Sequence, residues 1–148
     1  MVLLITKRCC RTNFPLRSKF AAERGVNCIS GGSMQAMDIR VFVPSKDYDE
    51  SQCFYQALGF EMEPATGDLS IFSNGNCTFF LQRFYNEDFA SNLMLQLIVS
   101  DIQEAFVTVS SIEGLNVRYE PIKLEPWGKV IYLWGPSGEL WHITELNS

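Results

Sequence analysis

The sequence predicts an α+β fold in which two βαβββ units form a curved mixed sheet around a cleft. Three observations favour this class. Strand-like alternation begins at Met37, two helical segments each open with an acid-x-x-Glu pattern, and the elements recur in the same order. The two helix-opening acids, Asp47 and Asp101, lie 54 positions apart (101 − 47). The helix of each unit leaves one sheet face uncovered, and two such faces curled together would enclose a small ligand.

The first unit begins with residues 37–43, which alternate and are rich in β-branched side chains, as strands are. Asp47 and Glu50 then predict a capped helix that runs to Leu58 and ends at Gly59. An Asn74-Gly75 pair indicates a tight hairpin. The strands on either side of this hairpin are expected at Leu69–Ser73 and Thr78–Arg83.

The second unit repeats this order. Leu93–Val99 is predicted as a strand, and a helix should start after Asp101 and end near Gly114. Three further strands are expected at Val117–Tyr119, Lys129–Trp134 and Glu139–Glu145.

Charge separates the N-terminal segment from the rest of the chain. Residues 1–33 hold six basic residues and one acid, a charge of +5, whereas residues 34–148 hold six basic and sixteen acidic residues, a charge of −10. We interpret residues 1–36 as a flexible basic segment and 37–148 as the domain, with units at about 37–84 and 92–146. The segment could instead be a targeting or interaction arm. An acidic domain repels nucleic acid and attracts cations, although acidity also serves solubility alone.

Other compositional features exclude several classes. No apolar run approaches the roughly 18 residues of a membrane span, so no membrane partner is expected. The five cysteines are odd in number and form no CxxC motif, which argues against a disulfide framework or a zinc site and favours the cytoplasm. Cys53 and Cys77 lie in helix and strand patterns and are expected to be buried thiols.

Three stretches resemble the glyoxalase/bleomycin-resistance/dioxygenase (vicinal oxygen chelate) superfamily. They read "FYQALGFE" after Asp47, "LMLQLIVSDIQEAF" at the start of the second unit, and "EPWGKVIYLWGPSGELWHI" near the end. The last resembles the closing strands of that family around a "DPxG" turn, with Gly135 where the family usually has Asp. The resemblance implies the two-unit fold over residues 37–146.

The resemblance also implies positions for four metal ligands, and the residues found there do not suit a metal. These positions fall on Arg40, Met94, His142 and either Phe80 or Gln82. Arginine only donates hydrogen bonds, and methionine is a soft ligand unsuited to zinc, iron or manganese. We therefore predict no metal, no cofactor and no catalytic residue, as in metal-free bleomycin-resistance-like members.

The predicted ligand site combines polar and aromatic residues. Strand alternation and the family spacing assign Arg40, Phe42, Met94, Gln96 and His142 to one cavity, with Trp127 and Trp134 near its rim. Each has a plainer reading. Arg40 could pair with Asp38, His142 could be a core histidine with one satisfied nitrogen, and each tryptophan could serve packing.

The leading functional hypothesis is a homodimeric protein that binds and sequesters a planar or cationic small molecule without a metal. Aromatic faces suit such ligands. The alternative is a glyoxalase-type lyase, isomerase or dioxygenase with an atypical site, in which His142 transfers protons. A third hypothesis is a regulatory module that uses its dimer surface. The sequence does not identify the ligand.

Overall fold

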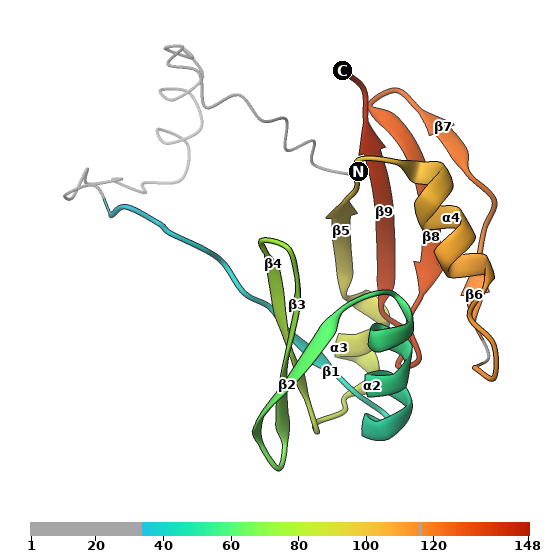
Figure 1. Cartoon of the computed structure of the whole chain (residues 1–148). Coiled ribbons are helices and arrows are strands. Elements are labelled where there is room, and N and C mark those ends of the chain that lie inside the picture. Colours follow the sequence, from blue (N-terminus) through green and yellow to red (C-terminus); the bar gives the residue numbers. More distant parts are fainter. Residues whose placement is uncertain (1–33, 116) are drawn as a thin grey trace, which may run out of the picture. The chain divides into compact units, whose positions relative to one another are not determined.

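The computed structural model describes residues 34–115 and 117–148, and residues 40–148 form one compact unit (Figure 1). Its elements, in chain order, are β1 (Phe42–Pro44), α2 (Tyr48–Ala57), β2 (Glu61–Thr66), β3 (Leu69–Asn74), β4 (Cys77–Gln82), α3 (Glu87–Asn92), β5 (Met94–Ile98), α4 (Ile102–Ser110), β6 (Arg118–Tyr119), β7 (Lys123–Glu125), β8 (Gly128–Trp134) and β9 (Leu140–Leu146). The predicted α+β class with two repeated units is confirmed. The predicted flexible segment, residues 1–36, lies almost wholly outside the described residues.

Each repeat forms its own mixed sheet. In the first sheet the strand order is β1-β4-β3-β2, with β1 parallel to β4. In the second sheet the order is β5-β9-β8-β6, β5 is parallel to β9, and the short β7 also pairs with β8. The strand that opens each unit is therefore placed beside the strand that closes it. Figure 1 shows α4 along one face of the second sheet, beside β8 and β9.

The helix starts follow the predicted capping pattern. The Asp47 side chain accepts a hydrogen bond from the Glu50 amide at 2.9 Å, at the start of α2. Asp101 accepts bonds from the amides of Gln103 and Glu104, at 2.7 and 3.1 Å, at the start of α4. These bonds satisfy amide groups that the first helical turn leaves without a partner.

The structure differs from the expected strands at β1, at β2 and at the short β7 (Lys123–Glu125), which was not expected. Residues 37–41 are not part of a strand, and β1 begins only at Phe42. In the described residues β1 pairs with β4, from Phe42 opposite Phe80 to Pro44 opposite Gln82. The strand β2 was not located from the sequence, because it is exposed, rich in acids and contains Pro64, which strand patterns disfavour except at a sheet edge. It is an edge strand here.

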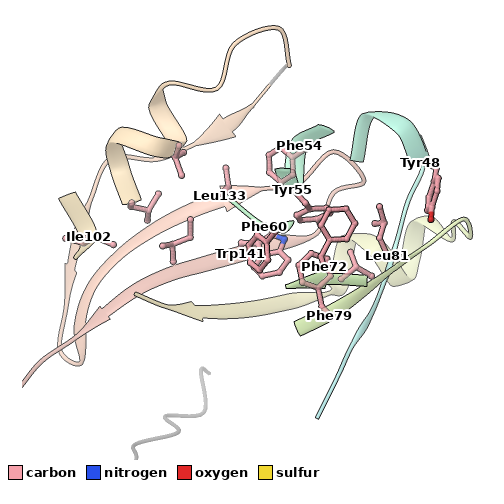
Figure 2. Close-up of a cluster of buried hydrophobic side chains, with 14 residues drawn as sticks. Tyr48, Phe54, Tyr55, Phe60, Phe72, Phe79, Leu81, Ile102, Leu133 and Trp141 are labelled. Atoms are coloured by element: carbon pink, nitrogen blue, oxygen red, sulfur yellow. The ribbon is translucent and has the colours of Figure 1, made fainter. Parts of the chain in front are cut away.

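The hydrophobic core lies between the helices and one face of each sheet. Rings from both units meet there: the Trp141 ring centroid lies 5.7 Å from that of Tyr55 and 5.5 Å from that of Phe79 (Figure 2). The expectation that Trp141 points away from His142 into a core against a helix is confirmed, since Tyr55 belongs to α2. Burial of these aromatic side chains joins the two units into one core.

The two described cysteines are not buried. Cys53 and Cys77 are both exposed free thiols, so the expectation of buried thiols was wrong. Cys53 lies on the outer side of α2, and Cys77 is the first residue of β4, beside the hairpin turn, where the strand has little cover. Among the described residues, none of the helices has the length and apolar character that crossing a membrane requires.

Candidate functional site

The second sheet has one face that packs into the core and one open face. Leu95, Leu97 and Trp141 pack into the core, so their neighbours Met94, Gln96 and His142 project from the opposite face. Gln96 is the direct cross-strand partner of His142, and Met94 is the partner of Leu140. The structure therefore places three of the predicted ligand-binding residues together on the open face.

His142 has the most constrained environment on this face. The residue is only 9% exposed, and its Nε2 atom is buried with no hydrogen-bond partner in the described part of the chain. The Tyr132 ring stands edge-on to the imidazole, with ring centroids 4.8 Å apart. Burial lowers the pKa of His142, while the nearby Glu125 carboxylate acts in the opposite direction. The imidazole is thus neutral near pH 7, with a polar atom that lacks a partner.

Tyr132 connects the imidazole to an acidic rim. Its hydroxyl donates to Oε1 of Glu125 at 3.1 Å, and the Lys123 ammonium lies 5.2 Å from the ring centroid. Burial, followed by the hydrogen bond to Glu125, raises the pKa of Tyr132. Sequence reasoning did not include Tyr132 or Glu125 in the site. The signal for Tyr132 was present, because it lies two residues before Trp134 and alternation puts both on the same face.

Arg40 and Phe42 lie at the first sheet instead. The Phe42 and Phe80 rings are cross-strand neighbours with centroids 4.8 Å apart, and the Arg40 guanidinium carbon lies 5.8 Å from the Phe80 centroid. Phe42 is 47% exposed. These residues form a cationic and aromatic group on the open face of that sheet.

The two groups of predicted site residues do not face each other within one chain. Phe79 and Trp141 are in contact across the core, and each is next in sequence to a residue of an open face, Phe80 or His142. The open faces therefore both point away from the shared core. A single cavity lined by both groups would need surfaces from two chains.

The two predicted rim tryptophans differ in their surroundings. Trp134 ends β8, and the Arg118 guanidinium carbon lies 3.9 Å from its ring centroid, a close cation–π contact. Trp127 lies in the turn between β7 and β8, is half-buried, and its carbonyl accepts a bond from the Asn147 amide at 3.0 Å. Trp134 shares the His142 face by alternation, because Tyr132 is the cross-strand partner of His142. Trp127 lies at the opposite end of β8 from Trp134.

The residues at the implied ligand positions do not fit a metal. Arg40 lies beside the first sheet and His142 in the second, the open faces of the two sheets point away from the shared core, and Met94 offers a thioether. The described residues also hold no group of three or more His, Cys, Asp or Glu side chains able to bind an ion together. We therefore derive no chemistry that passes through a metal.

The arrangement matches that of known structures. No family model matches the sequence, and neither does any curated protein. Solved structures do match, and they show that the chain has the glyoxalase/bleomycin-resistance fold. A bleomycin resistance determinant encoded on transposon Tn5 is similar over 76% of this chain and 100% of its own, at 21% identity and a TM-score of 0.64.

Two further structures illustrate the range of proteins with this fold. The antibiotic-binding protein TnmS3 from Streptomyces sp. CB03234 matches 78% of this chain and 100% of its own, at 18% identity and a TM-score of 0.65. A lactoylglutathione lyase from Agrobacterium tumefaciens matches 76% of this chain and 95% of its own, at 17% identity and a TM-score of 0.59. The fold is therefore shared by binding proteins and an enzyme, so the function of this chain has to be inferred from the residues of its site.

Proposed function

We propose that this chain binds a planar or cationic small molecule in an aromatic-lined cleft, without a metal and without chemical conversion. The observation that carries the proposal is the open face of the second sheet. A neutral, buried imidazole there has an Nε2 atom with no partner in the described residues, next to the Gln96 amide and the Tyr132 ring. A buried polar atom without a partner costs about 1–3 kcal/mol, which a ligand group could recover.

The aromatic and acidic surroundings support the ligand class. Tyr132 and Trp134 contribute aromatic surface, of which Lys123 and Arg118 already cover one side. Glu125 and the net charge of the domain favour a cation over an anion. Among the proteins of the same fold, one was solved as a bleomycin-binding protein in complex with bleomycin, at 21% identity. This likeness supports sequestration as the use of the cleft. The cytoplasmic location in the proposal rests on the cysteine pattern.

A homodimer is part of the proposal. Because the Arg40 group and the His142 group lie on faces that point away from one core, a second copy is needed to bring them to one cleft. Phe42 and Met94, exposed by 47% and 63%, would then be covered by the partner.

The test is ligand binding by site variants. Bleomycin and ethidium serve as probes in fluorescence and calorimetric titrations of the full chain. We expect both probes to bind the native chain. The dissociation constant should rise by at least about ten-fold in Arg40→Met and in His142→Leu, because each variant loses a polar contact with the ligand. His142→Leu should keep or raise the melting temperature, since it removes a buried polar group without a partner.

A matched control separates ligand contact from damage to the fold. Val107, 65% exposed on α4, lies away from both open faces, and Val107→Ala should bind as the native chain does. Binding should also survive chelation with EDTA. Loss of binding after EDTA, or stoichiometric zinc, nickel, manganese or iron in the purified protein, would favour the glyoxalase-type enzyme instead.

A further inference from the structure

A cavity lies on the core side of the second sheet, opposite the open face. It has a volume of about 440 Å³, within the roughly 300–1,000 Å³ range of small-molecule sites. The end of α2, the β3–β4 hairpin, the end of β5 and the first turns of α4 surround it. Leu97 and Ile143 line it from the core side of the sheet, since they alternate with Gln96 and His142. Ile98, at the end of β5, is the lining residue that shares the Gln96 side, and Gln96, Tyr132 and His142 are not part of the lining.

The lining combines an apolar floor with a negative rim. Leu58, Leu97, Val109 and Ile143 are among its apolar lining residues. Asp101 and Glu104 supply two carboxylates, and the lining, all of it in described residues, contains no lysine, arginine or histidine. Asp101 already caps α4 through its Oδ1 atom, so Glu104 is the carboxylate with more freedom to meet a ligand. The positive end of the helix offsets only about half a charge.

We propose that this cavity is a second binding site, for a small organic ammonium ion with an apolar body. The ammonium group would lie beside Glu104 and Asp101, and the apolar body would cover the floor formed by Leu58, Leu97 and Val109. An anion of the same shape would meet two like charges and should be excluded. Ion pairing at a partly exposed site adds modest affinity, so selectivity for charge is the clearer property to measure.

Cys77 provides a local reporter, because this exposed thiol lies in the lining. The full chain is prepared with serine at four other cysteines, namely Cys9, Cys10, Cys28 and Cys53. Alkylation of Cys77 by iodoacetamide, a neutral reagent, is then timed with increasing 2-phenylethylamine, 3-phenylpropanoate or 3-phenylpropanol. We expect saturable protection by the amine, weaker protection by the alcohol and none by the acid.

Charge reversal tests the role of the rim. In Glu104→Lys the half-protecting concentration of the amine should rise by at least about five-fold, and 3-phenylpropanoate should begin to protect. Glu113→Lys is the matched control, because it changes the net charge equally at an exposed acid outside the lining. This control should leave protection unchanged.

Two further outcomes decide the proposal. His142→Leu should leave the protection of Cys77 intact, so failure of the proposed cleft and failure of this cavity are distinguishable. The proposed ammonium site would be overturned by any of three results. These are equal protection by all three compounds, protection by none of them, or the same protection by the amine in native and Glu104→Lys chains. If the cysteine replacements unfold the chain, the native protein is used instead, and only the amine should raise its melting temperature.

Discussion

A buried carboxylate at the closing turn organises the junction between the two repeats. Glu139 is fully buried, accepts a hydrogen bond from the Tyr55 hydroxyl of α2, and accepts a second bond from the Ser137 amide at 3.1 Å. Burial raises the pKa of Glu139, although both hydrogen bonds oppose the rise. A Cβ atom at Gly135 would lie 2.0 Å from Oε1 of Glu139. A side chain at position 135 would therefore collide with the Glu139 carboxylate, which is why glycine fits this position.

This arrangement predicts that the Tyr55 hydroxyl matters more than an ordinary buried hydroxyl. Tyr55→Phe should cost about 1.5–3 kcal/mol of unfolding free energy in urea titrations, because the bond is to a carboxylate. Tyr48→Phe is the matched control. It removes a neutral bond to the Ser70 hydroxyl and should cost about 0.5–1.5 kcal/mol. In a Glu139→Gln background the Tyr55→Phe cost should shrink, and an unchanged cost would contradict the coupling.

His142 predicts a pH dependence of stability. Burial lowers the pKa of His142 in the folded chain. Well above the unfolded-state pKa of about 6.5, the imidazole is neutral in both the folded and the unfolded chain, so it contributes nothing to the pH dependence of stability. As the pH falls below about 6.5, His142 takes up a proton in the unfolded chain but not yet in the folded chain. The free energy of unfolding therefore decreases until the pH passes below the pKa of His142 in the folded chain. We expect the native chain to lose more stability between pH 7.5 and 5.5 than His142→Gln does.

The sequence contains a single histidine, so native and His142→Gln chains differ in one imidazole and share all carboxylates. Any difference in their loss of stability therefore comes from the titration of His142. Urea titrations at the two pH values give the measurement. Equal losses in the two proteins would show that His142 has the same proton affinity folded and unfolded.

At the scale of elements, the β8–β9 pair has a contact that only glycine allows. Gly128 begins β8 opposite Leu146, and a Cβ atom there would lie 2.1 Å from the Glu145 carbonyl oxygen. Because that neighbour is backbone, the strands would have to separate. Gly128→Ala should therefore cost at least about 1–3 kcal/mol. Gly67→Ala, with nothing within 4 Å of its added methyl group, should stay within about 0.5 kcal/mol. Urea unfolding that gives equal values would contradict this account.

How much the sequence could predict depended on how strongly each element is patterned. The helices α2 and α4 were predictable because Asp47 and Asp101 provide explicit caps, and β3 and β4 because Asn74-Gly75 specifies their turn. The short β7 and α3 were not located, since three and six residues carry too little periodicity.

The candidate site shows a similar limit. Alternation placed Met94, Gln96 and His142 on one face, because a regular parallel pair carries the pattern from β5 to β9. Alternation could not show that Phe42, with Arg40 just before it, lies at a different sheet with its own open face, since that depends on how the two units pack. Periodicity within strands contains no information about the contact between Phe79 and Trp141 that sets this packing.

At the scale of the whole molecule, the two open faces predict self-association. We expect light scattering at micromolar concentration to give twice the chain mass of 16.8 kDa. Stable interfaces bury about 1,200–2,000 Å² in total, and both open faces expose large apolar side chains such as Phe42, Met94 and Ile98.

Met94→Glu should shift the protein to monomers, because a charge buried without a partner is costly. Val107→Glu places the same charge on the exposed side of α4 and should leave the dimer intact. A native chain that is already monomeric would remove the basis for a cleft shared between two copies.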